Sequence, residues 1–203
     1  MIFERILILR VIITSLIGIT SYVGDRLLQE KNEVIRALSD NFTHATVGGL
    51  TWSLILILSK KSILQNISSV VLCFFIASFV DVDHFLAAGS WKLHDAAHSA
   101  KRGYLHCSTI PITMWLILFL YSKIFNQQNV ANYGWIILSS FLSHHIRDAN
   151  RRGMWFCPIG STPPIPYYFY LSLSMIFPYI VHFCMSLLTT HSIEIKESLV
   201  NIV

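Results

Sequence analysis

Long runs without a formal charge constrain this chain more than any other feature. They are residues 41–59, 62–80, 103–122, 124–146 and 153–193. A helix that crosses a bilayer needs about 20 largely apolar residues, and irregular backbone cannot face lipid. The sequence therefore predicts helices that cross a membrane.

Composition excludes two other classes of protein. Charged residues make up 13% of the 203 residues and hydrophobic residues 54%, whereas about a quarter of the residues in an ordinary soluble domain are charged. A chain this apolar can be neither a soluble domain nor a disordered one. Its 15 basic and 11 acidic residues are dispersed, so we expect membrane lipid as a partner and no nucleic acid.

The predicted fold is an all-α, polytopic helical bundle with five to six spans, and residues 1–203 form a single integral membrane domain. The first span is marginal because it contains Arg10, which can snorkel to the interface. No small-residue cleavage site follows it, so we expect it to be retained. The predicted spans are residues 6–24, 43–59, 63–80, 105–122, 131–147 and 167–189.

The four cysteines, Cys73, Cys107, Cys157 and Cys184, lie far apart in the sequence and form no C-x-x-C pair. Such spacing indicates neither a disulfide scaffold nor a zinc ribbon. We expect free thiols.

Histidines and aspartates gather at particular ends of the predicted spans. They form four groups: His44, Asp81-Val82-Asp83-His84, His106, and His144-His145-x-x-Asp148. The first and third groups open spans that leave one side of the membrane, and the other two close spans that return to it. Alternation of direction therefore predicts that all four groups meet at one face.

Imidazole and carboxylate ligands without thiolate suit zinc, with manganese or iron as alternatives. His144 and Asp148 share a helix face, and so do Asp81 and His84. Asp83 would point about 200° away from Asp81 on a continuous helix, so one of the two could lie behind the ligands. Seven candidates exceed the four ligands of a single zinc, so one or two ions are expected: His44, Asp81, Asp83, His84, His106, His144 and Asp148.

Other polar residues have two interpretations. Arg102, Arg147, Arg151 and Arg152 are either topology signals or phosphate-binding groups. His94, His98, His182 and His191 are expected to be ordinary interfacial residues.

These motifs resemble two known families. His44-Ala-Thr-Val-Gly48, Asp81-Val-Asp-His84, Arg102-Gly-Tyr-Leu-His106 and His144-His-Ile-Arg-Asp148 resemble the YdjM-like inner-membrane metal-dependent hydrolases, and more distantly zinc phospholipase C and P1 nuclease. That resemblance covers about half of the chain and implies that all seven candidates bind metal. Lys101 replaces a histidine of its pattern, which would remove a ligand or an outer donor, and neither Asn150 nor Arg151 matches its threonine after the last aspartate.

Nearly the whole chain is similar to the transmembrane protein 267 family. The residues that carry this second resemblance are Arg36-Ala-Leu-Ser-Asp40 and His144-His-Ile-Arg-Asp-x-x-Arg-x-Gly-x-Trp-x-Cys-Pro158. It implies a small multi-pass membrane protein and assigns no activity.

The leading hypothesis is a metal-dependent hydrolase of a phosphoester, with a lipid phosphoester as a candidate substrate. Asp83 or Asp148 would accept a proton, and Arg102 would bind the phosphate. A non-catalytic protein with a structural metal site and a metal or proton transporter remain alternatives, although a transporter should distribute its ligands across the membrane.

Nine of the 15 basic residues fall on the predicted site-bearing side, which by the positive-inside tendency turns that side to the cytoplasm. Site arginines would bias this count. We expect an internal membrane such as the endoplasmic reticulum.

Overall fold

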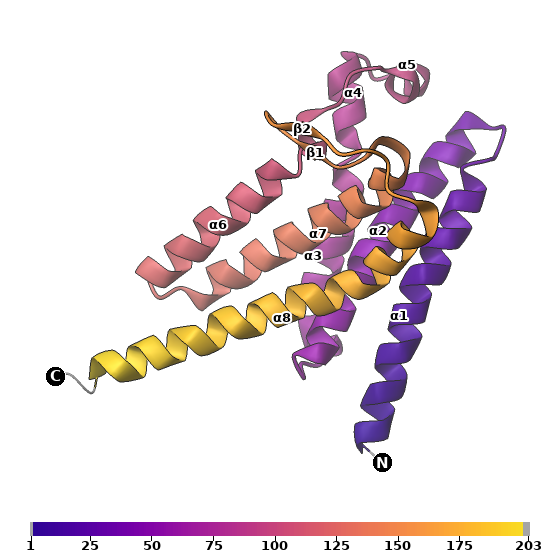
Figure 1. Cartoon of the computed structure of the whole chain (residues 1–203). Coiled ribbons are helices and arrows are strands. Elements are labelled where there is room, and N and C mark those ends of the chain that lie inside the picture. The colour runs from indigo at the N-terminus through magenta and orange to yellow at the C-terminus, as the bar shows by residue number, and fades with distance from the viewer. Residues whose placement is uncertain (1, 201–203) are drawn as a thin grey trace.

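The structure is a computed structural model that describes the backbone of residues 2–200 and the side chains of residues 4–188. His191 lies outside the described side chains. The described backbone is almost entirely helical (Figure 1). Its α-helices are α1 (Ile2–Leu27), α2 (Glu33–Leu58), α3 (Ile67–Phe79), α4 (Val82–Ala88), α5 (Leu93–His98), α6 (Thr109–Ile124), α7 (Gln128–Arg152) and α8 (Tyr167–Val200).

Short elements complete the fold. The one-turn helices η1 (Leu64–Asn66) and η2 (Tyr104–His106) precede α3 and α6, and the strands β1 (Trp155–Phe156) and β2 (Gly160–Ser161) pair antiparallel after α7. The predicted all-α membrane bundle is thus confirmed as a largely helical chain with apolar helices.

The predicted number of spans is not confirmed. Within the described residues, four stretches are long and apolar enough to cross a membrane: Glu4–Leu27, Glu33–Leu58, Leu64–Ala88 and Tyr167–Leu188. The predicted spans 105–122 and 131–147 correspond to α6, which has only 16 residues, and to α7, whose inner face is polar. The predicted spans contain no charged residues in most of their length, but α6 is shorter than the roughly 20 residues that a crossing helix needs.

Helix α2 begins earlier than the sequence predicted. The side-chain oxygen of Asn32 accepts hydrogen bonds from the backbone N–H groups of Val34 (2.9 Å) and Ile35 (3.3 Å). This N-cap satisfies donors that would otherwise lack a partner, so the helix starts at Glu33. Residues 33–42, predicted as part of a connection, instead add helical turns before His44.

Helix α2 is the centre of the bundle. It packs against α1, α3, α7 and α8, and most of its residues from Thr43 onward are buried. Helices α1, α3, α6 and α8 expose large apolar side chains, for example Leu7, Phe75, Ile117 and Phe183. This distribution suits helices whose outer faces contact lipid.

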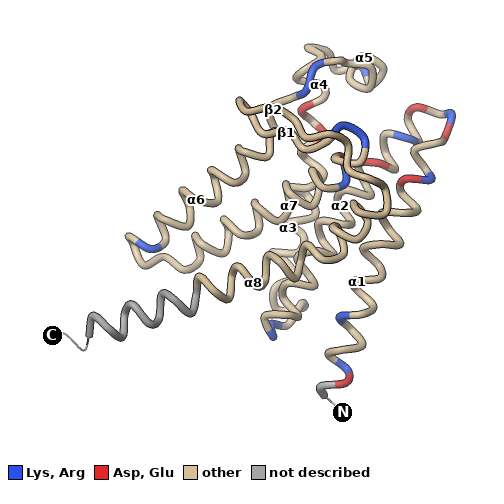
Figure 2. The backbone as a smooth tube through the Cα atoms, viewed as in Figure 1, with Lys and Arg blue, Asp and Glu red and all other residues tan. Residues whose placement is uncertain are grey.

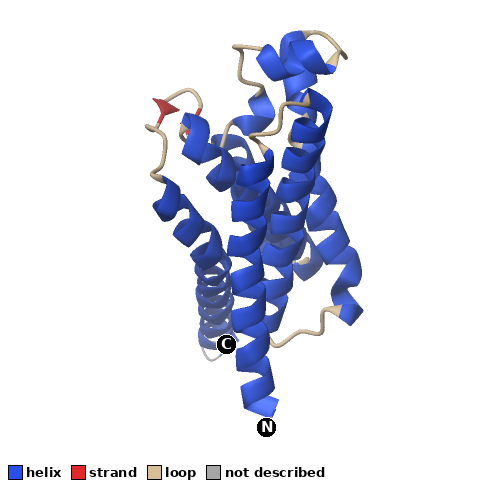
Figure 3. Ribbon diagram, turned by 90° about the vertical axis from the view of Figure 1, so that its right-hand side faces the viewer, coloured by secondary structure: helices blue, strands red, loops and turns tan. Residues whose placement is uncertain are grey.

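One end of the bundle carries the polar structure. Helices α4 and α5 and the strands lie at the end opposite the start of α1 (Figure 3). Most acidic residues, and many of the basic ones, also gather there (Figure 2). The end of α1, the start of α2, the end of α3 and the end of α7 meet at this end of the bundle.

The expectation of free thiols is wrong for two cysteines. Cys107 and Cys157 form a disulfide, with their Cα atoms 5.8 Å apart. A backbone hydrogen bond joins the same two segments: Ser108 N–H donates to the Trp155 carbonyl at 2.8 Å. The 50-residue separation concealed the pair, whereas Cys73 and Cys184 are free as expected.

The disulfide predicts the labelling of the chain by a thiol reagent. In a Cys73→Ser/Cys184→Ser background, the unreduced protein should take up no maleimide after unfolding, and two equivalents after reduction. Mass spectrometry measures the uptake. In the same background, Cys107→Ser should expose one reactive thiol, at Cys157, without reductant. Uptake of two equivalents by the unreduced protein that keeps both cysteines would contradict the pairing.

Candidate metal centre

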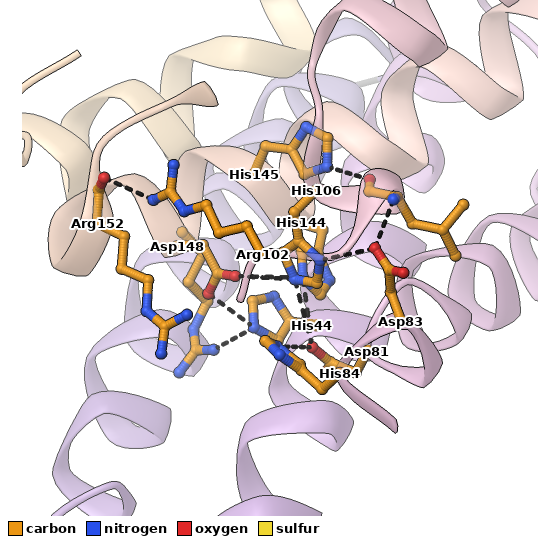
Figure 4. Close-up of polar contacts among 12 residues, drawn as sticks. His44, Asp81, Asp83, His84, Arg102, His106, His144, His145, Asp148 and Arg152 are labelled. Carbon is orange, nitrogen blue, oxygen red and sulfur yellow. Dashed lines mark hydrogen bonds and ion pairs between the residues drawn. The ribbon is translucent and has the colours of Figure 1, made fainter. Parts of the chain in front are cut away.

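Four histidines and two aspartates converge at the polar end of the bundle (Figure 4). They form three overlapping groups of three, and within each group the ligand atoms lie within 4.8 Å of one another. The groups are His44/Asp81/His144, Asp81/His84/His106 and His106/His144/Asp148. The structure therefore brings together six of the seven predicted candidates.

His144 shows how the fold prepares a ligand. Its side chain is fully buried, and its Nδ1 lies 2.8 Å from the carbonyl oxygen of Ala77. A carbonyl can only accept, so Nδ1 carries the proton and Nε2 presents a lone pair. Among the described residues this Nε2 has no hydrogen-bond partner, and it lies 3.5 Å from both Asp81 and Asp148. Such an arrangement is typical of a metal-binding histidine.

Each carboxylate of the cluster faces three imidazoles. The nitrogen–oxygen distances, 3.4–3.9 Å, exceed those of charged hydrogen bonds. Asp81 faces His84, His106 and His144, and Asp148 faces His44, His106 and His144. This distribution suits one cation or two neighbouring cations that share carboxylates.

The electrostatics of the cluster favour a positive group between the carboxylates. Burial alone would lower the pKa of His106, but hydrogen bonding and the charges of Asp148, Asp83 and Asp81 raise it to about 9. Burial would raise the pKa of Asp148, yet the charge of Arg151 and the neighbouring imidazoles hold it well below its usual value. Both shifts follow from the close packing of carboxylates and basic groups in the cluster.

Asp83 lies behind the cluster. It is buried, accepts a hydrogen bond from Leu105 N–H and faces His106 Nδ1 at 3.5 Å. A Cβ at Gly103 would fall 2.0 Å from its carboxylate carbon, so the backbone can approach only because residue 103 is glycine. His145 supports the same segment, because its Nε2 contacts the Leu105 carbonyl at 2.9 Å. Asp83 and His145 thus position His106.

The sequence analysis named Arg147 and Arg151 but not their acidic partners Asp25 and Asp40, which lie behind this cluster. Arg147, only 2% exposed, donates to Asp40, to His44 Nε2 at 3.0 Å and to Asp25 at 3.2 Å. Arg151 joins Asp40 (2.9 Å) to Asp148. Asp40 precedes His44 by one helical turn. A predicted helix that began at residue 33 would therefore have placed Asp40 and His44 on the same helix face.

A pocket of about 130 Å³ opens beside the cluster, which is ample for several waters or a small anionic group. Asp81, His106 and Asp148 form one side of it. Three arginines also line it, namely Arg102, Arg151 and Arg152.

The arginines of the pocket differ in what they can do. The guanidinium of Arg102 donates to the carbonyl oxygens of Arg152 (2.6 Å) and Gly153 (3.2 Å) and to Ser161 Oγ (3.0 Å). Arg102 therefore fastens the segment after α7. The guanidinium of Arg152 is exposed and has no hydrogen bond or ion pair within the described part of the chain.

Comparison with known proteins identifies relatives along most of the chain. It is 40% identical to transmembrane protein 267 of Mus musculus over 180 residues, which is 86% of this chain and 82% of the relative. The Bos taurus protein of the same name is 37% identical over 174 residues (83% and 80%), and that of Xenopus laevis 35% over 182 (87% and 83%). No family model and no solved structure matches, and the resemblance to metal-dependent hydrolases finds no support in these comparisons. The names and coverage of these relatives show that the chain belongs to the transmembrane protein 267 family.

Proposed function

We propose that this protein is a metal-dependent hydrolase that cleaves phosphoesters at a membrane surface. The observation that carries the proposal is the buried Nε2 of His144, which the Ala77 carbonyl aims at two carboxylates and which accepts no hydrogen bond from any side chain that the structure describes. A buried polar atom without a partner costs about 1–3 kcal/mol. A bound cation would remove that cost.

The ligands would be histidine nitrogens and carboxylate oxygens, which favours zinc, with manganese or iron as alternatives. Asp83 is proposed to position His106 rather than to bind the ion, because its carboxylate is engaged with the backbone of Leu105. Because Asp81 and Asp148 each face three imidazoles, two ions would fit. The proposed ligands are Asp81, His84, His106, His144, Asp148 and His44. To bind through Nε2, His44 would give up the hydrogen bond that this nitrogen accepts from Arg147.

The remaining roles follow from charge and access. A divalent cation would supply Lewis acidity for water activation and for the phosphoryl oxygens. Asp148, kept ionised by Arg151, is the proposed proton acceptor. Arg152, with an exposed and unengaged guanidinium, replaces Arg102 as the proposed phosphate-binding group.

The position of the pocket suggests a lipid-borne substrate. Trp155 lines the pocket and packs against the exposed Tyr104, with ring centroids 6.3 Å apart. Tyrosine and tryptophan prefer the level of the lipid headgroups. A phosphoester at that level could enter from the membrane surface. We also propose that α6 and α7, which pack against each other, cross the bilayer as a pair and give six spans. The 16 residues of α6 would cross where the bilayer thins locally.

A structural metal site is the second candidate. The cluster joins α2, the α3–α4 junction, η2 and α7, so a cation would link four parts of the bundle. The pocket beside the cluster favours the enzyme, because a purely structural site needs no opening. Transport is not favoured, since the cluster lies at one end of the described bundle.

The disulfide bears on orientation. Disulfides persist in oxidising compartments such as the endoplasmic reticulum lumen, and Cys107 directly follows His106. Arg102, Arg147 and Arg151 form site contacts, so they are poor topology signals in the count of basic residues. We propose that the site faces the lumen, or the exterior, rather than the cytoplasm.

Hydrolysis provides the direct test of the enzyme. The purified chain should cleave a chromogenic phosphodiester or a phospholipid in vesicles, and chelation should abolish the activity. Asp148→Asn should lower kcat by about 100-fold or more, because it removes the proton acceptor and a ligand. His182→Ala, at a histidine bonded to Ser59, is the matched control. Wild-type turnover that survives chelation, or no turnover with metal bound, would contradict the proposal.

The two arginines should separate in kinetics and stability. Arg152→Ala should raise KM for a phosphoester by about tenfold, the cost of one charged hydrogen bond, without changing the melting temperature. Arg102→Ala should lower the melting temperature, because it releases the carbonyl oxygens after α7. Steady-state kinetics and thermal unfolding measure both effects. An unchanged KM in Arg152→Ala would remove this residue from the site.

A further inference from the structure

A second group of potential ligands lies outside the cluster described above. It consists of Glu33, His94 and His98, here called the α5 triad, whose ligand atoms lie within 4.8 Å of one another. His94 and His98 are one helical turn apart on α5, and Glu33 is the first residue of α2. Residues four apart on a helix share a face, and two such histidines form a common zinc-binding pair.

The distances within the α5 triad are too long for charged hydrogen bonds. Nδ1 of His94 lies 3.5 Å from one oxygen of Glu33, and Nδ1 of His98 lies 3.4 Å from the other. Direct bonds between such groups measure about 2.7–2.9 Å. Oxygen Oε1 of Glu33 is shielded from solvent and accepts no hydrogen bond in the described part of the chain.

The two imidazoles already lie side by side. Their ring centroids are 4.3 Å apart, and the Nδ1 of His98 also donates to the His94 carbonyl at 2.8 Å. To bind a cation through that nitrogen, His98 would move its proton to Nε2 and give up the hydrogen bond to the His94 carbonyl. The side chains of His94 and His98 are 74% and 58% exposed, so an ion and its remaining water ligands can reach them.

Helix α5 is short and packs mainly against α4. It has six residues, far fewer than a helix needs to be stable alone. The left-handed Gly89, with φ of 63°, ends α4 and turns the chain towards it. The segment that contains α5 leads on to Arg102 and His106, so a link to α2 would fasten it beside the pocket.

We propose that Glu33, His94 and His98 form a separate divalent cation site that binds Zn²⁺ through two imidazoles and one carboxylate, with water completing the coordination. The ion fastens α5 to the start of α2. This site shares no residue with the candidate metal centre, so it does not rest on the proposed hydrolase function.

Zinc titration of the full chain in detergent, after chelation and dialysis, tests the proposal. His94→Ala/His98→Ala should bind one Zn²⁺ fewer than the wild type, whereas the control His182→Ala should bind the same number. Glu33→Gln should weaken this one binding event by about tenfold or more, since losing a ligand costs at least as much as losing an outer partner.

Hydrogen exchange gives a second measurement. Zn²⁺ should slow amide exchange in residues 93–98 of the wild type and leave the double variant unchanged. Because both histidines are largely exposed, the metal-free double variant should melt at the wild-type temperature. Equal stoichiometry in wild type and double variant, or Zn²⁺-independent exchange in α5, would overturn the proposal. Loss of an ion in His144→Ala reports on the candidate metal centre, so the proposal for that centre and the proposal for the α5 triad can fail separately.

Discussion

The structure depends on one buried guanidinium. Arg147 of α7 joins Asp25 at the end of α1 to Asp40 and His44 on α2. Removing one partner from a buried ion pair typically costs about 3–5 kcal/mol, because the other charge is left without compensation. The ends of three helices are therefore held in fixed relation, at the point where an otherwise apolar bundle becomes polar.

The candidate metal centre is built outward from this anchor. Asp40 binds both Arg147 and Arg151, and Arg151 in turn holds Asp148. From the other side, the Ala77 carbonyl fixes the ring of His144. Each inner group is oriented by an outer partner, which is the arrangement that tunes ligands in metal sites. Structure and proposed chemistry meet at Asp148, which faces imidazoles and pocket alike.

Much of the site could be predicted because alternation of helix direction is a strong constraint. It placed His44, His106 and His144 at one face from their positions at span ends alone, and the structure brings them together. The resemblance to the transmembrane protein 267 family, resting on Arg36–Asp40 and the residues after His144, is confirmed by the relatives. Helices α6 and α7 do run in opposite directions (Figure 1), although neither is among the four described stretches that are long and apolar enough to cross a membrane.

Other features could not be predicted from local pattern. The start of α2 depended on the cap at Asn32, so Asp40 was assigned to a connection and its ties to Arg147 and Arg151 were missed. The Cys107–Cys157 bond depends on how η2 meets the segment after α7, which spacing does not encode. Arg102 matched a motif, but its partners are carbonyl oxygens that carry no sequence signal.

The metal content of the full chain tests the proposed metal centre most directly. The protein is purified and dialysed without chelator, and elemental mass spectrometry counts the ions per chain. We expect at least one tightly held zinc, manganese or iron ion per chain, lost in His144→Ala and retained in His182→Ala. Less than stoichiometric metal in the wild type, or equal content in the two variants, would contradict it.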